Sequence, residues 1–103
     1  MQLHKLKKIT IVAEDSLKQA LLKKVIELGA TGYTFRQAEG YGSRGARSDQ
    51  FTSNVEVELI CSEKVATDIL TFVSKNYFDH FACIAWTSDV EVVRGDRYTG
   101  GTK

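Results

Sequence analysis

The sequence predicts an α+β fold in which an antiparallel sheet carries two helices on one of its faces. Apolar residues recur at helical spacing in two stretches, 15–28 and 62–73, and runs typical of strands precede and follow each of them. The chain has 103 residues and no apolar run approaching 18 residues. We therefore expect one domain, residues 1–103, without a membrane-spanning segment.

The first strand and the first helix are expected before residue 30. The run 9–13 is rich in β-branched residues and is typical of a buried strand. Asp15 or Ser16 is placed to cap the helix that follows, and Gly29 is placed to end it. The apolar positions that repeat at helical spacing are Leu17, Leu21, Val25 and Leu28. We expect them to form the face that the helix buries.

A second strand is expected over 32–37, followed by a long loop. Alternation along this strand puts Tyr33 and Phe35 on one face and Thr34 on the other. The loop, 38–53, is long for a compact domain, and loops of this length are usually functional or disordered. We interpret it as a mobile ligand-binding loop.

The second half of the chain predicts a strand, a helix and two closing strands. Apolar and charged residues alternate over 55–61, which indicates a strand with one buried face. Ser62 is placed to begin a helix whose core-facing residues are Val65, Ile69, Phe72 and Val73. The closing strands are 82–86 and 90–93. The order is that of the ferredoxin-like βαββαβ plan with an extra C-terminal strand.

The helices are expected to cover only one face of the sheet, which leaves the other face exposed in a single copy. The candidates for an apolar surface on that second face are Ile11, Tyr33 and Trp86. A domain of this size buries a modest core. Association of several copies, which would bury the second face, is therefore expected.

The stretch 39–48 has the composition of an anion-binding loop. It holds three glycines, two arginines and two serines. Glycine lets backbone N–H groups approach a phosphate, and each guanidinium adds a fixed fork of donors. A solvated polar loop is the alternative, since most charged loops are of that kind. Arg44 and Arg47, three residues apart among glycines, favour a phosphorylated small molecule as the ligand.

The overall charge argues against some classes of function. The formal net charge is +1, which is too small for binding of nucleic acid or membrane by bulk electrostatics. The basic start of the chain, 1–8, is not followed by an apolar segment. No secretory signal is therefore predicted, and the expected compartment is the cytoplasm.

Other residues with chemical potential are interpreted as structural. Cys61 and Cys83 form no Cys-x-x-Cys pair, so no metal site is predicted and both are expected to be buried, inert thiols. Glu56 and Glu58 have the spacing of paired carboxylates for acid–base catalysis. Their alternation with apolar residues favours a polar sheet face instead. Because no nucleophile–base pair is found elsewhere, an enzyme is not predicted.

The chain resembles PII-like signal-transduction proteins, specifically the SbtB and carboxysome-associated branch that is linked to bicarbonate uptake. The resemblance rests on the element order and on the segments 29–34, 40–48 and 75–79. It implies a homotrimer that binds adenine nucleotides in clefts between subunits, with AMP, ADP, ATP or cyclic AMP as ligand. It also implies, as a protein partner, a bicarbonate transporter or another part of the carbon concentrating machinery.

The resemblance further implies which residues contact the nucleotide. The loop residues that match phosphate-contacting positions are Ser43, Arg44 and Arg47, with Gly40 and Gly42 at the loop base. The second-strand positions that match those beside the adenine are Gly32 and Thr34. The third-strand positions that match those lining the base are Leu59 and Ile60. The position that matches an arginine reaching the nucleotide from the adjacent subunit is Arg94.

One departure from the family bears on the choice of ligand. Classical PII proteins carry glycines and a lysine after the second helix for the outer phosphates, whereas this chain has Tyr-Phe-Asp-His-Phe at 77–81. A triphosphate would lose charge neutralisation there, so we expect AMP, ADP or cyclic AMP to compete well with ATP. The link to inorganic carbon implies bicarbonate as a second ligand, bridged by Ser43 or Arg47.

The main alternative is a ferredoxin-like RNA-binding module, since such sheets serve RNA recognition and Gly-Ser-Arg segments bind single strands. An RNA-recognition domain would carry basic and aromatic residues on its third strand. This strand carries Glu56 and Glu58 instead, which would repel an RNA backbone. No nucleic-acid partner is therefore expected.

Overall fold

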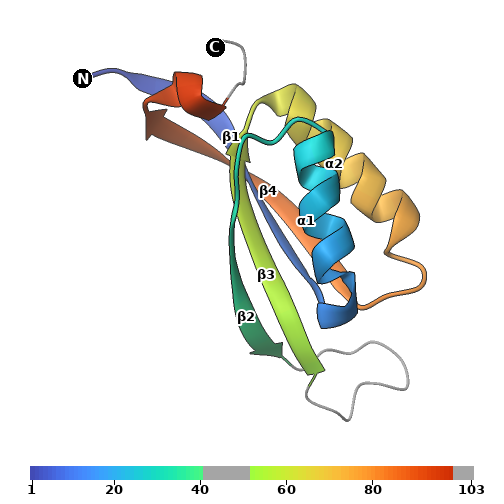
Figure 1. Cartoon of the computed structure of the whole chain (residues 1–103). Coiled ribbons are helices and arrows are strands. Elements are labelled where there is room, and N and C mark those ends of the chain that lie inside the picture. The colour runs from blue at the N-terminus through green and yellow to red at the C-terminus, as the bar shows by residue number, and fades with distance from the viewer. Residues whose placement is uncertain (41–51, 99–103) are drawn as a thin grey trace.

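The computed structural model describes residues 1–40 and 52–98, and its elements are drawn in Figure 1. In this described part the strands are β1 Leu3–Glu14, β2 Thr34–Gly40, β3 Thr52–Cys61 and β4 Cys83–Val93. The helices are α1 Lys18–Glu27 and α2 Glu63–Asn76. Short 3-10 turns follow β1 and β4, at Asp15–Leu17 and Gly95–Tyr98.

The four strands form one sheet in the order β2-β3-β1-β4, with every neighbouring pair antiparallel. Both helices lie across the same face of this sheet (Figure 1), which we call the helix face; the other is the open face. Because side chains alternate along a strand, the register assigns each residue to a face. The predicted α+β fold with two helices on one side of an antiparallel sheet is confirmed.

The hydrophobic core lies between the helix face and the two helices. Its buried sheet residues are Ile9, Ile11, Ala13, Val55, Val57, Leu59 and Cys61. Its buried helix residues include Leu21, Val25, Ile69 and Val73. Burying one of the larger aliphatic side chains stabilises the fold by about 1.5–3 kcal/mol relative to leaving it exposed. The β3 residues in this core are the alternate apolar residues of 55–61, so the predicted buried face of β3 is confirmed.

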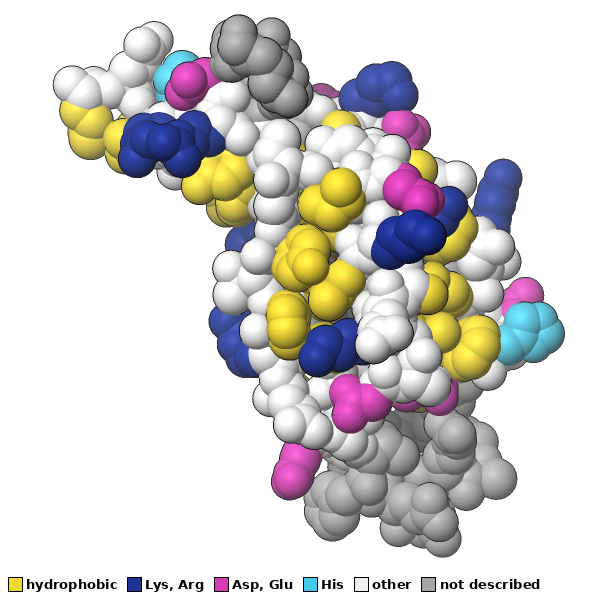
Figure 2. All heavy atoms as spheres, in the orientation of Figure 1, with side chains coloured by type: hydrophobic (Ala, Val, Ile, Leu, Met, Phe, Trp, Pro, Cys, Tyr) yellow, Lys and Arg dark blue, Asp and Glu magenta, His cyan; other side chains and the backbone are white. Residues whose placement is uncertain are grey.

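Two of the three residues expected on the open face lie on the helix face instead. Ile11 is fully buried in the core, because it pairs with the buried Val57 and shares its face. Phe35 also pairs with Val57, and the Tyr33 ring lies 6.2 Å from the Phe35 ring. Apolar side chains accordingly gather on the surface beside β2 and α1 (Figure 2). Only Trp86, which pairs with Thr10, lies on the open face as expected.

The first helix begins differently from the prediction, whereas the second begins as predicted. The chain leaves β1 through the 3-10 turn, so α1 begins at Lys18 with no side-chain cap. The Ser16 hydroxyl, expected as a cap, donates to the Glu14 carboxylate at 3.0 Å. Ser62 caps α2, since its hydroxyl oxygen accepts from the Val65 backbone N–H at 3.3 Å.

The two closing strands expected at 82–86 and 90–93 are one strand, β4, which pairs with β1 from Ala13↔Cys83 to Leu3↔Val93. The polar residues between the expected strands suggested a break. In the structure Asp89 lies opposite Lys7 and forms an ion pair with it, so the strand continues through this stretch. The extra C-terminal strand is therefore absent from the described part of the chain.

Gly29 ends the α1 segment in a conformation that other residues rarely adopt. Its φ is 120°, and a Cβ placed there would lie 2.9 Å from Val65 Cγ2 on α2. We expect Gly29→Ala to lower the free energy of unfolding by about 1–3 kcal/mol, through backbone strain and helix displacement. Urea denaturation measures it. Gly32→Ala, where a Cβ meets nothing within 4 Å, is the control and should stay near wild type. Equal stability of both variants would refute this account.

Candidate functional site

The loop between β2 and β3 begins and ends on paired strand residues. Gly40 pairs with Thr52, so part of the loop predicted at 38–53 is strand. The Gln37 side-chain amide donates to the Ser53 hydroxyl at 2.6 Å, which ties the two strands together just before the loop. A Cβ on Gly40 would lie 3.5 Å from Asn54 Nδ2, an ordinary contact. Four predicted loop residues lie outside the described residues: the loop-base residue Gly42 and the phosphate-contacting Ser43, Arg44 and Arg47.

A ladder of ion pairs crosses the open face beside the predicted adenine-binding positions. Arg36 lies 3.2 Å from Glu56 and 3.7 Å from Glu58, and Lys8 lies 3.4 Å from Glu58. The Arg36 guanidinium donates to Glu56, and this hydrogen bond, with the attraction of both carboxylates, raises the pKa of Arg36. The interpretation of the two glutamates as a polar sheet face is confirmed.

The ladder also bears on the alternative of an RNA-binding sheet. Glu56 and Glu58 lie on the open face, which is the face left available by the helices. Both carboxylates are paired with Arg36 or Lys8, so the ladder offers a phosphate backbone no uncompensated positive charge. The sequence interpretation missed Arg36, although its position two residues after Thr34 placed it on the same face.

The predicted adenine-binding positions are brought together only in part. Thr34 begins the edge strand β2, is exposed, and pairs with Glu58. Ile60 is half-buried and lies two residues from Glu58 on the same face, so the two positions share one end of the β2–β3 pair. Gly32 is exposed with open space around it. Leu59 is only 3 % exposed and its side chain belongs to the core, so only its backbone groups could contact a ligand.

Arg94 lies at the opposite end of the sheet from the loop. It follows β4, is exposed, and has a φ of 64°. The next residue, Gly95, packs so closely on His4 that a Cβ would lie 2.4 Å from it. β1 spans 12 residues between the level of Asn54, near the loop, and that of Val93. At about 3.3 Å per residue, these ends are roughly 35 Å apart, farther than one nucleotide can bridge.

Glu14 forms hydrogen bonds to the connection between α2 and β4. The sequence did not predict these contacts. Its carboxylate accepts from the Ala82 backbone N–H at 2.8 Å and from the Ser16 hydroxyl at 3.0 Å. Its backbone N–H donates to the Ala82 carbonyl at 3.0 Å. These contacts hold the connection against the end of β1 that lies nearest the loop.

The same connection, 77–81, is an aromatic turn. The buried Tyr77 ring makes edge contacts with Phe72 and Phe81, at centroid distances of 5.5 and 5.9 Å. The backbone N–H groups of His80 and Phe81 both donate to the Tyr77 carbonyl. Two N–H groups are thereby committed to the turn itself and do not offer a phosphate cradle.

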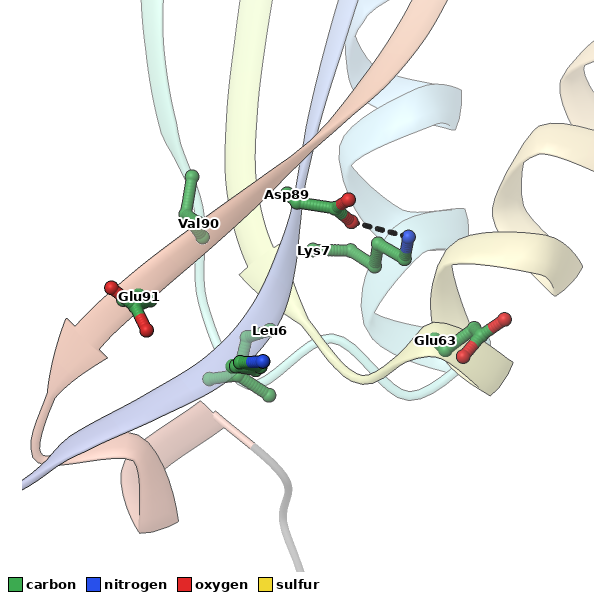
Figure 3. Close-up of a pocket in the computed structure, with 7 residues that line it drawn as sticks. Leu6, Lys7, Glu63, Asp89, Val90 and Glu91 are labelled. Atoms are coloured by element: carbon green, nitrogen blue, oxygen red, sulfur yellow. Dashed lines mark hydrogen bonds and ion pairs between the residues drawn. The ribbon is translucent and has the colours of Figure 1, made fainter.

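A hollow of about 490 Å³ lies between the β1–β4 ends and the start of α2 (Figure 3). Lys7 and Asp89 point toward one another across it and form an ion pair, with Glu63 at its α2 side. The hydrogen bond from Lys7, with its positive charge, lowers the pKa of Asp89. The same pair raises the pKa of Lys7. Of the charges that line the hollow, Lys7 and Asp89 already neutralise each other.

The two cysteines of the described part are held in their protonated form, which is the less nucleophilic one. Burial raises the pKa of the Cys61 thiol to about 11, and burial with the nearby Glu14 charge raises that of Cys83 to about 11. Both are free thiols that are protonated at neutral pH; Cys61 is buried as predicted, whereas Cys83 is only half-buried. Residues 1–40 and 52–98 bring together no metal-binding group of three His, Cys, Asp or Glu. In the same residues, no helix has the length and apolarity to cross a membrane.

Comparison with known proteins defines the family. Residues 6–97 match the family model described as nitrogen regulatory protein P-II. A solved structure from Thermus thermophilus, described as a PII-like signaling protein, is similar at 47 % identity and a TM-score of 0.82, covering 95 % of this chain and 99 % of that one. The match spans almost all of the described fold, so this chain belongs to the P-II family of regulatory proteins.

Structures of CPII from Thiomonas intermedia K12 share the fold. The form bound to ADP and bicarbonate has 21 % identity and a TM-score of 0.81, covering 94 % of this chain and 97 % of that one. The apo form has 20 % identity and a TM-score of 0.75, covering 88 % and 95 %. At this identity the likeness establishes the fold alone.

Proposed function

We propose that this protein is a cytoplasmic PII-like regulator that binds an adenine nucleotide between subunits and controls inorganic-carbon uptake or concentration. Membership of the P-II family supports the regulatory role. CPII, which shares the fold, is described as bound to ADP, AMP and bicarbonate. The glycines, serines and arginines of 40–48 have the composition that a phosphate requires.

The main support for a site between subunits is the distance, within one protomer, between the residues that are predicted to contact the nucleotide. The loop base at Gly40 and the predicted contact Arg94 lie at opposite ends of the sheet. If the loop and Arg94 contact the same nucleotide, the loop must come from one copy and Arg94 from a second copy. The open face offers the surface for such an assembly, since Ile84 is 57 % and Trp86 46 % exposed there. A homotrimer would bury both side chains.

The nucleotide would act by selecting one arrangement of the loop. Binding shifts a conformational equilibrium only as far as the ligand prefers one state, and contacts from the loop's own Arg44 and Arg47 supply that preference. The loop then presents or withholds a surface for its protein partner, which we propose is a bicarbonate transporter or a carboxysome-associated protein. Light scattering for the assembly and calorimetric titration with ADP test this function.

The proposed ranking of nucleotide affinities follows from the turn at 77–81. Its aromatic rings and committed N–H groups give the outer phosphates no added positive charge. We expect AMP and ADP to bind at least as tightly as ATP, with cyclic AMP also a ligand. Competition titrations against a fluorescent ADP analogue measure the order. An ATP affinity well above that for ADP would contradict this role of the turn.

Bicarbonate is proposed as a second ligand beside the nucleotide phosphate, bridged by Ser43 or Arg47. Linkage then requires that bicarbonate tighten AMP or ADP binding and that the nucleotide tighten bicarbonate by the same factor. ATP should gain less, because its terminal phosphate competes for the same donors. The measurement is a titration of each nucleotide with chloride replaced by bicarbonate at fixed pH and ionic strength. Unchanged affinities would leave a regulator that responds to nucleotide alone.

A further inference from the structure

The connection between α2 and β4, residues 77–82, lies at the end of the sheet where β2 ends and β3 begins (Figure 1). Glu14, the last residue of β1, pairs with Asn54 on β3. Asn54 is two residues from Thr52, which pairs with Gly40 at the base of the loop. The connection therefore reaches the sheet near the place where the phosphates of the proposed nucleotide would lie.

Glu14 holds this connection through both polar main-chain groups of one residue. The Glu14 backbone N–H donates to the Ala82 carbonyl at 3.0 Å, and the Glu14 carboxylate accepts from the Ala82 N–H at 2.8 Å. The other carboxylate oxygen accepts from the Ser16 hydroxyl at 3.0 Å, which orients the side chain. A residue that is bound at its N–H and at its C=O is fixed in position and in rotation. Glu14 therefore determines where the chain enters β4.

The rest of the connection is held at its other end. The Tyr77 side chain is buried, and the Tyr77 carbonyl accepts from the backbone N–H groups of His80 and Phe81. The sequence of this turn, Tyr-Phe-Asp-His-Phe, contains no lysine or arginine. With Tyr77 buried and Ala82 bound by Glu14, the connection borders the site as a fixed segment that adds no permanent positive charge.

The position of the connection is expected to matter more than the charge of Glu14. Glu14 is two strands away from β2 and two residues short of the level of Gly40. Strand and residue spacings place it roughly 12 Å from the base of the loop. This exceeds the screening length of about 8 Å at physiological ionic strength. Repulsion between the carboxylate and a phosphate chain is therefore weak, and the hydrogen bonds to Ala82 are the larger effect.

We propose that Glu14 is a positioning residue that holds the 77–82 connection beside the nucleotide site and thereby limits the length of the phosphate chain that the site accepts. This inference rests on the proposed binding of an adenine nucleotide beside the loop. While the connection is held, a third phosphate meets a fixed turn without lysine or arginine. When Ala82 is released, the connection is free to move away and a triphosphate gains room. Glu14 thus favours AMP and ADP over ATP.

The test compares wild type, Glu14→Ala and Glu14→Gln in calorimetric titrations with AMP, ADP and ATP. Glu14→Ala should raise the affinity for ATP relative to ADP by about tenfold, which is what a small steric difference in a binding pocket is worth. The Gln side chain still has an oxygen that can accept from the Ala82 N–H. Glu14→Gln should therefore keep this ratio within about twofold of the wild-type value, because the charge that it removes is screened.

Two further measurements separate positioning from a loss of stability. Ile69→Val, in the buried core on α2, is the control, since it lowers stability without a contact to the connection. It should leave the ATP-to-ADP ratio unchanged, because a variant that is merely less stable loses all nucleotides alike. Amide hydrogen exchange reports the anchor without any ligand. Exchange at Ala82 should be faster in Glu14→Ala than in wild type and Glu14→Gln.

The outcomes distinguish this inference from the proposed function. If the wild type binds ADP but Glu14→Ala keeps the wild-type ratio, Glu14 does not set the phosphate length. Equal rises of the ratio in both Glu14 variants would mean that the charge acts and the anchor does not. Unchanged exchange at Ala82 in Glu14→Ala would also overturn the anchor. If the wild type binds none of the three nucleotides, the proposed function fails and this inference fails with it.

Discussion

Trp86→Glu is expected to convert the proposed trimer into single chains. Trp86 is 46 % exposed on the open face, where Ile84 is also exposed, and both would be buried in the assembly. Burying an unpaired carboxylate in a protein contact costs several kcal/mol. Light scattering should report one chain per particle where the wild type gives three. Because the nucleotide contacts come from two copies in our proposal, ADP binding should be lost with the assembly.

Ile26→Glu is the matched control for this prediction. Ile26 has the same exposed fraction as Trp86, 46 %, but lies on α1 on the other side of the sheet. The substitution introduces the same charge but does not alter the open face, so the variant should remain a trimer. If Trp86→Glu keeps three chains per particle, or if both variants dissociate, the open face is not the assembly surface.

Arg47→Ala is expected to remove most adenine-nucleotide binding while leaving the fold intact. A charge-assisted contact to phosphate is worth roughly 1.5–3 kcal/mol, so the affinity should fall by about ten- to a hundredfold. Arg44→Ala should behave similarly. Both positions lie outside the described residues. Calorimetric titration with ADP measures the loss, and circular dichroism checks the fold.

Lys75→Ala serves as the control for the arginine variants. It removes an exposed positive charge from the last turn of α2, so it tests whether a change of net charge alone lowers the affinity. Its affinity should equal that of the wild type. Wild-type affinity in both arginine variants would contradict the assignment of phosphate binding to this loop.

The sequence predicted the parts of the fold that local patterns determine. Alternation over 55–61 identified the buried face of β3, and Ser62 identified the start of α2. The continuous β4 was not predictable from its own residues, because the polar stretch through Asp89 is held in the sheet by Lys7 on another strand. The face occupied by Tyr33 likewise depends on the register between β2 and β3.

The parts of the candidate site that could be predicted are those whose amino-acid composition indicates a ligand. The glycines and arginines of 40–48 indicate an anion ligand directly. The assignment of Leu59 came from a family position, whereas the structure puts its side chain in the core. Two contacts were missed because they join distant parts of the chain: the Arg36 ladder, and the Glu14 carboxylate, which binds a backbone group 68 residues away.

Calorimetric titration of ADP into the wild-type protein, with light scattering on the same sample, tests the central claim most directly. The account predicts three chains per particle and saturable binding of one ADP per chain, with no comparable heat from GDP. A single-chain particle that still binds ADP would contradict the intersubunit site. Absence of saturable heat with both ADP and AMP would contradict the proposal that this P-II family protein responds to adenine nucleotides.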